Sequence, residues 1–111
     1  MGEVMSIAQL MTGMPLAFNA QEAGNLSAVI QYHFTGQEPG DWFMTIADGK
    51  CTSEQGVAES PTITITAPSE VWLAISRGEL DGAAAFMQGK FKVQGDMSLL
   101  MRMDKLFSAG S

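Results

Sequence analysis

Large apolar residues recur at every second position in three separate stretches of the chain. These stretches are Ala28–Thr35, residues 42–47 and residues 62–66. Each one places every second side chain on an apolar face, which is the pattern of a strand with one buried side. In the first of them, Ala28, Ile30, Tyr32 and Phe34 are expected to point one way. The intervening residues are expected to point the other way, and they are Val29, Gln31, His33 and Thr35.

Two further strands are predicted beside these three. The pair Asp48-Gly49 follows the second stretch and predicts a tight hairpin, because glycine accepts the positive φ that a two-residue turn requires. The hairpin leads into Lys50–Gln55, whose mixed polarity is typical of an edge strand. The short run at residues 91–94 again alternates and predicts the fifth strand.

The start of the chain has helical periodicity. Ile7, Leu10 and Met11 recur at a spacing of three to four residues, and Ser6 before them is a good N-cap. Pro15 interrupts this pattern and is acceptable as the first residue of a second, shorter helical piece. The polar segment after it, up to Asn25, is expected to hold one more helical turn.

The second half of the chain predicts three more helices. Ala67-Pro68 is expected to end a strand, since proline donates no amide hydrogen to the ladder. Ser69, Asp81 and Asp96 are then predicted as the N-caps of three successive helices.

This order of elements predicts an α+β fold, with a five-stranded, mostly antiparallel sheet that has one face covered by helices. Residues 1–111 contain no repeat, linker or low-complexity tract and are expected to form one domain. The connection between Thr66 and Phe91 is long enough for the last strand to pair parallel with a neighbour.

Charge and composition exclude several classes of partner. The formal net charge is −6 and the six basic residues are scattered, which argues against nucleic acid and against stable anchoring on anionic membranes. No apolar run approaches the roughly 20 residues needed to span a bilayer. The single cysteine, Cys51, cannot form an internal disulfide, so a cytoplasmic location is expected.

Candidate reactive groups are few. His33 is the only histidine and lies on the polar side of its strand, where it is expected to be exposed and structural. Cys51 has no neighbouring histidine to lower its pKa. Most aspartates are expected at turns and caps, where a backbone-bonding role explains them. We therefore expect no catalytic residue, no metal site and no cofactor, and a protein that is not an enzyme.

Residues 69–107 resemble the second half of the sterol carrier protein 2 (SCP2) lipid-transfer domain. The residues that carry the resemblance are Trp72, Gly78-Glu79-Leu80-Asp81, Phe86-Met87-Gln88-Gly89-Lys90 and Lys92-Val93-Gln94-Gly95-Asp96. Gly13-Met14-Pro15 and the strands from Leu26 onward resemble the first half in order and spacing.

The resemblance implies non-enzymatic binding and transfer of a lipid in an apolar tunnel between helices and sheet. The expected ligand is a fatty acid, a fatty acyl-CoA, an isoprenoid or a sterol. Ala83-Ala84-Ala85 make one helix small, so a narrow chain is as plausible as a sterol. The chain ends without the Ser-Lys-Leu-like peroxisomal address of eukaryotic members, which agrees with the expected cytoplasmic location. The candidate lining residues are Phe18, Ile30, Tyr32, Met44, Val71, Ile75, Phe86, Leu99, Leu100 and Met103.

A second reading stays open, because periodicity alone does not separate a filled core from a hollow one. The same apolar faces could be packed solid or buried in a homodimer, in an accessory module of lipid or quinone metabolism. Its contact surfaces would be Lys50–Gln55 and the methionine-rich first helix. The expected oligomeric state is a monomer or a homodimer.

Overall fold

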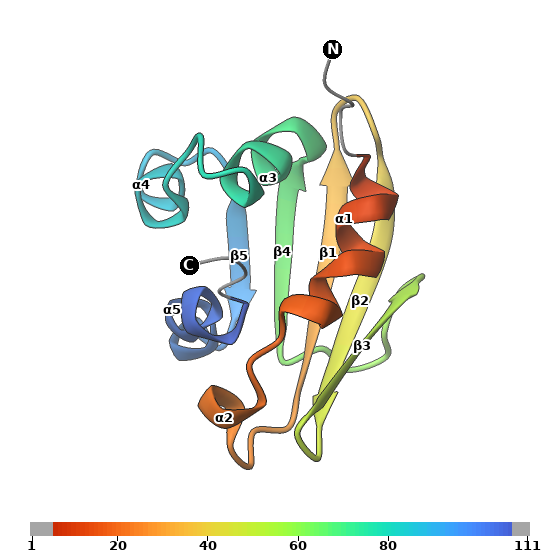
Figure 1. Cartoon of the computed structure of the whole chain (residues 1–111). Coiled ribbons are helices and arrows are strands. Elements are labelled where there is room, and N and C mark those ends of the chain that lie inside the picture. The colour runs from red at the N-terminus through yellow and green to blue at the C-terminus, as the bar shows by residue number, and fades with distance from the viewer. Residues whose placement is uncertain (1–5, 108–111) are drawn as a thin grey trace.

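The computed structural model describes residues 6–107, apart from the side chain of Asp104. It contains a five-stranded sheet whose helices all lie on one face (Figure 1). The elements in chain order are α1 (Ile7–Gly13), a 3-10 helix η1 (Met14–Ala17), α2 (Ala20–Ala23), β1 (Ala28–Thr35), β2 (Gly40–Ala47), β3 (Lys50–Gln55), β4 (Ile63–Pro68), α3 (Ser69–Ser76), α4 (Gly82–Met87), β5 (Lys92–Gly95) and α5 (Met97–Leu106). The predicted α+β class and the mostly antiparallel sheet are confirmed.

The strand order is β3-β2-β1-β4-β5, and only β1 and β4 pair in parallel. The prediction of a parallel last strand is therefore wrong, since β5 runs antiparallel to β4. The physical reason is visible in Figure 1, where α3 and α4 lie at the end of the sheet at which β4 finishes. The chain consequently enters β5 at that end and runs back along β4.

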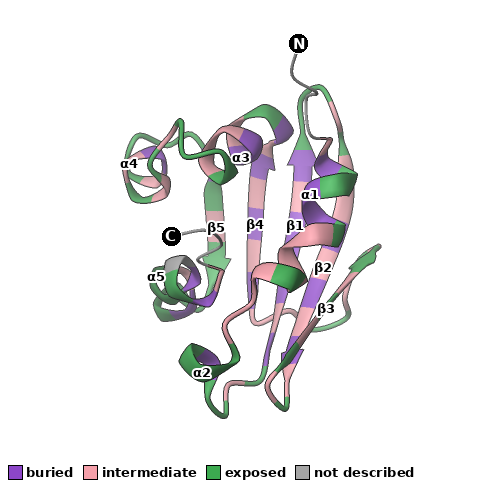
Figure 2. Ribbon diagram, viewed as in Figure 1, coloured by how far each residue is buried: buried purple, intermediate pink, exposed green. Residues whose placement is uncertain are grey.

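The predicted alternation of the central strands is confirmed. Ala28, Ile30, Tyr32 and Phe34 of β1 are all buried on the helix-covered face, as are alternate residues of β2 and β4. Figure 2 shows these positions as buried bands that alternate with partly exposed ones. The neighbouring β5 is mostly exposed.

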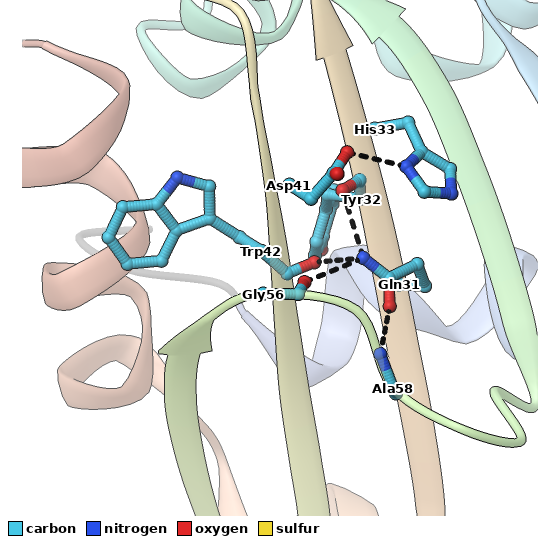
Figure 3. A network of polar contacts seen from close by, with 7 residues as sticks. All are labelled: Gln31, Tyr32, His33, Asp41, Trp42, Gly56 and Ala58. Carbon is cyan, nitrogen blue, oxygen red and sulfur yellow. Dashed lines mark hydrogen bonds and ion pairs between the residues drawn. The ribbon is translucent and has the colours of Figure 1, made fainter.

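Gln31 breaks this pattern, because it is buried although it lies on the opposite, polar face of β1. Its Nε2 donates hydrogen bonds to the carbonyls of Trp42 (3.0 Å) and Gly56 (3.1 Å), and its Oε1 accepts one from the amide of Ala58 (2.7 Å) (Figure 3). The side chain thereby fixes the segment that connects β3 to β4. A buried amide is stable here because both of its polar ends have partners.

Helix capping follows the sequence closely. Ser6 and Gln9 form a reciprocal capping box at the start of α1, and Asp81 and Asp96 cap α4 and α5 as predicted. Ser69 is not an N-cap, however, because β4 continues through Pro68 and Ser69 is already the first residue of α3.

Ser69 instead helps to dock the β1–β2 turn onto two helices. Its Oγ accepts a hydrogen bond from the amide of Glu38 (2.9 Å), and the Glu38 carboxylate accepts one from the amide of Ile7 at the start of α1 (2.9 Å). Glu70 accepts a further bond from the amide of Gln37 (3.3 Å). Hydrogen bonds from the Glu70 and Gln37 amides lower the pKa of the Glu70 carboxyl. One turn thus holds the N-termini of α1 and α3 together.

Candidate functional site

A pocket of about 490 Å³ lies between the helices and the β5 side of the sheet. The helices that enclose it come from both halves of the chain, and the pocket is partly open to solvent. Its lining consists of Leu10 and Met14 from the N-terminal helices, Trp72, Ile75 and Ser76 from α3, Gly82, Ala83, Phe86 and Met87 from α4, Phe91, and Leu100, Met101, Met103 and Phe107 from the C-terminal segment.

Aromatic rings form the inner wall of this pocket. The ring of Trp72 meets Phe91 edge to face at a centroid distance of 5.6 Å, and Phe91 lies 5.6 Å from Phe86. On its other side Trp72 contacts Tyr32 of β1 at 5.4 Å. These contacts connect the pocket wall to the core, and aromatic pairs in such geometries stabilise one another.

Methionines lie at the opening. The side chains of Met87 on α4 and Met101 on α5 line the pocket and are also 85% and 72% exposed, respectively. Unbranched thioether side chains change rotamer easily and adapt to different apolar partners. The opening is therefore lined by the side chains best suited to move aside.

The lining offers almost no polar chemistry. Ser76 donates its hydroxyl hydrogen to the carbonyl of Leu73 (2.7 Å), which leaves the Trp72 indole as the other polar group in the wall. None of the described lining residues is ionisable. The pocket can enclose an apolar molecule, and it contains no group for acid–base or nucleophilic chemistry.

The residues proposed from the sequence divide between this pocket and the packed core. Ile75, Phe86, Leu100 and Met103 line the pocket. Ile30, Tyr32, Met44 and Leu99 are buried in the core outside this lining, and Phe18 and Val71 pack against the core at partly buried positions.

Sequence reasoning did not select several lining residues. Trp72 and Phe91 were noted only as a family landmark and as part of a strand, and Leu10 and Met14 only as part of the first helix. Met87 could have been found by helical spacing, because it follows Ala83 by four residues. Met101 has no such relation to the other lining residues of its helix, since it directly follows Leu100.

The other candidate groups lie away from the pocket lining. His33 is paired across the strands with Asp41, with 2.6 Å between Nδ1 and Oδ1, on the face opposite the helices (Figure 3). Asp41 lies within β2, so it is an exception to the expectation that aspartates occupy turns and caps. Burial raises the pKa of the Cys51 thiol to about 11, so the nucleophilic thiolate is disfavoured.

Neither a metal-ligating cluster nor a membrane-spanning helix is present in the part of the chain that the structure describes. Between residues 6 and 107, no three histidine, cysteine or carboxylate side chains are grouped so as to hold a metal ion. Over the same part of the chain, no helix has the length and apolar character required to cross a membrane.

Comparison with known protein families gives a match over most of the chain. The model of the SCP-2 sterol transfer family matches residues 14–108. Hydroxysteroid dehydrogenase-like protein 2 of Xenopus tropicalis is 26% identical over 89 residues, which are 79% of this chain and 21% of that protein. Sterol carrier protein 2 of Homo sapiens is 30% identical over 71 residues, or 64% of this chain and 13% of that protein. The chain spans about a fifth or less of the length of these relatives.

Solved structures show the same fold. The palmitated SCP2L2 of Aedes aegypti superposes with a TM-score of 0.74 at 26% identity, covering 93% of this chain and 95% of that one. The sec-alkylsulfatase Pisa1 from Pseudomonas sp. superposes with a TM-score of 0.85 at 20% identity, covering 100% of this chain and 18% of that enzyme. This second likeness concerns the fold alone.

Proposed function

Because the chain belongs to the SCP-2 sterol transfer family, we propose that it binds and transfers an apolar lipid in the pocket between α1, α3, α4 and α5. The family is one of lipid-binding and lipid-transfer domains. The observation that carries the proposal for this chain is the apolar pocket of about 490 Å³ with no ionisable group in its described lining. Pockets of about 300–1,000 Å³ are typical of small-ligand sites.

The size of the pocket suits a single lipid chain. If a methylene group takes about as much space as a water molecule in the liquid, about 30 Å³, the pocket holds roughly sixteen such groups. Transfer of each of them out of water contributes about 0.8 kcal/mol. A long-chain acyl or isoprenoid group would therefore be held by burial alone, and a palmitated relative with the same fold supports this class of ligand.

An empty pocket would be costly. A closed cavity of this volume would destabilise the fold by roughly 12 kcal/mol at about 24 cal/mol per Å³, which rivals the roughly 5–15 kcal/mol of a whole domain. The open mouth reduces this cost by admitting water and methionine side chains. We expect the purified protein to carry a lipid, detected by native mass spectrometry and by solvent extraction. Bare protein whose melting temperature does not respond to added long-chain lipid would contradict the proposal.

Helix α5 is the proposed movable wall, because it lines the pocket through one face and exposes residues such as Ser98 and Arg102 on the other. Replacing Leu100 by glutamate should reduce lipid affinity at least about tenfold, since an ionised carboxylate would enter an apolar pocket. Met97→Glu is the matched control, because Met97 lies on the same helix outside the lining. Affinity is measured by calorimetry, and melting curves establish that both variants fold. Equal affinities in the two variants would exclude α5 as the wall.

The chemistry, the location and the oligomeric state of the protein complete the proposal. We propose a non-enzymatic role, supported by the raised pKa of Cys51 and by the engagement of His33 with Asp41. The pocket favours a carrier over a solidly packed interaction module. A cytoplasmic location and a monomeric or homodimeric state stay predictions.

A further inference from the structure

The pocket combines a substantial volume with a lining that carries no charge, and this combination bears on which lipids it accepts. On the basis of the proposed function, we propose that the pocket selects lipids with an uncharged polar end, such as long-chain alcohols and esters, over the corresponding carboxylates.

A buried carboxylate requires compensation by a cation or by several hydrogen-bond donors. The described lining supplies no cation and few donors. Its side chains are aliphatic, aromatic or thioether apart from Ser76, whose hydroxyl already donates to Leu73, and the Trp72 indole N–H is the one other side-chain donor among the described lining residues. An ionised head group drawn into this pocket would lose its hydration without replacement. An alcohol or ester loses far less hydration free energy on the same transfer.

None of the six basic residues of the chain, two arginines and four lysines, belongs to the pocket lining. Arg77 pairs with Glu79, with 3.0 Å between Nε and Oε2, and Arg102 donates to the carbonyl of Glu22 (2.9 Å). The net charge of −6 adds a long-range potential that disfavours the approach of anions.

The buried polar groups that have no partner among the described residues are also uncharged. They are the hydroxyls of Tyr32 on β1 and Ser53 on β3. Burial, and secondarily the Cys51 thiol, raises the pKa of Tyr32, so this side chain stays a neutral phenol. Among residues 6–107, the interior on the helix-covered side therefore offers neutral hydrogen-bonding groups and no buried cation to match a carboxylate.

The test compares two ligands of equal chain length, dodecan-1-ol and dodecanoate, by calorimetry at a pH well above the pKa of the acid. Wild-type protein should bind the alcohol at least about tenfold more tightly, which corresponds to about 1.4 kcal/mol. Methyl dodecanoate should behave like the alcohol. Equal affinities for alcohol and carboxylate would show that the charged end stays in solvent at the mouth, and this result would overturn the inference.

A matched pair of variants tests whether the missing charge is the cause. Ala83 lies in the lining on α4, and Ala83→Lys places a cation there, whereas Ala83→Gln adds a polar chain of similar length without charge. The lysine variant should move the alcohol-to-carboxylate preference about tenfold toward the carboxylate, and the glutamine variant should not. An equal shift in both variants would overturn the inference.

Failure of the proposed function has a different signature. If wild-type protein binds none of the three ligands, the carrier role itself fails, and the inference fails with it. If it binds all three with equal affinity, the carrier role stands and the charge selectivity is wrong. The wild-type comparison needs no variant and remains decisive even if Ala83→Lys does not fold.

Discussion

The helix-covered face of the sheet is solid on one side and hollow on the other. Under α1, the side chains of Ile30, Met44 and Ile46 are completely buried in a packed core. On the β5 side, the space between α3, α4 and α5 holds a pocket of about 490 Å³, at whose mouth Met87 and Met101 are exposed. Figure 2 shows the same contrast between the buried bands of β1 and the mostly exposed β5.

The difference shows that apolar residues at strand or helix spacing do not by themselves produce a closely packed core. In the solid half, long paired strands carry branched and aromatic side chains that interlock at crystal-like density. In the hollow half, short helices carry small residues such as Gly82 and Ala83, which do not reach the opposite wall. A bound lipid would fill the space in the hollow half, as side chains fill it in the solid half.

The largest expected effect comes from removing the same residue type from each half. Met44→Ala should reduce the free energy of unfolding by roughly 2–5 kcal/mol, because a fully buried side chain leaves a new cavity. Met103→Ala, in the pocket wall, should cost only roughly 1–2 kcal/mol, since its removal enlarges a space that already exists. Urea unfolding measures both values. Equal losses would show that the pocket side is packed as tightly as the core.

A smaller effect is expected at the unpaired hydroxyl of the solid half. Tyr32→Phe should raise the free energy of unfolding of lipid-free protein by about 1 kcal/mol, because it removes a buried polar group that has no partner among the described residues. Thermal and urea unfolding give the change. A loss of stability would mean that the hydroxyl is hydrogen-bonded in solution, by water or by a bound lipid, and that this half is less dry than the structure indicates.

The smallest effect concerns the anchoring of α5, the wall of the hollow half. A hydrogen bond from the Ser98 hydroxyl, together with the amides of Leu99 and Ser98, lowers the pKa of the Asp96 carboxyl. A carboxyl whose pKa is lower in the folded state than in the unfolded state stabilises the fold at pH values above its unfolded-state pKa, which is about 3.9. This contribution is lost as the pH falls through the lower pKa of the folded state.

Asp96→Asn keeps the capping oxygen and removes the charge. Wild type should therefore melt above this variant at neutral pH, and the difference should disappear in acid below the lowered pKa. Melting temperatures across the acid range test this expectation. A difference that stays constant with pH would show that the ionised carboxylate is not what holds the start of α5.

The elements of this fold could be predicted from the sequence because their signals are local. The alternation of Ala28–Thr35 and the caps at Ser6, Asp81 and Asp96 each depend on a few neighbouring residues. Strand boundaries shifted by one or two residues, as when β4 continued through Pro68, because tertiary pairing decides where a ladder ends.

The site was only partly predictable, because periodicity identifies a face and not a position along it. Ile30 and Ile75 both occupy apolar faces of their elements, yet Ile30 lies in the solid core and Ile75 lines the pocket. Their difference depends on strand order and on where the α4–α5 segment lies. Gln31 was missed for the same reason, since its partners come from β2 and from the segment after β3.

The β1–β2 turn has a consequence for how ligand specificity could change within this architecture. Glu38 and Gln37 hydrogen-bond to the first turns of α1 and α3, so the same β1–β2 turn fixes both helices to the sheet. The segment from Gly82 onward has no part in those contacts and supplies most of the outer boundary of the pocket. Residues 82–107 thus supply most of the positions at which ligand preference could change, although β5 within them also pairs with β4 and completes the sheet.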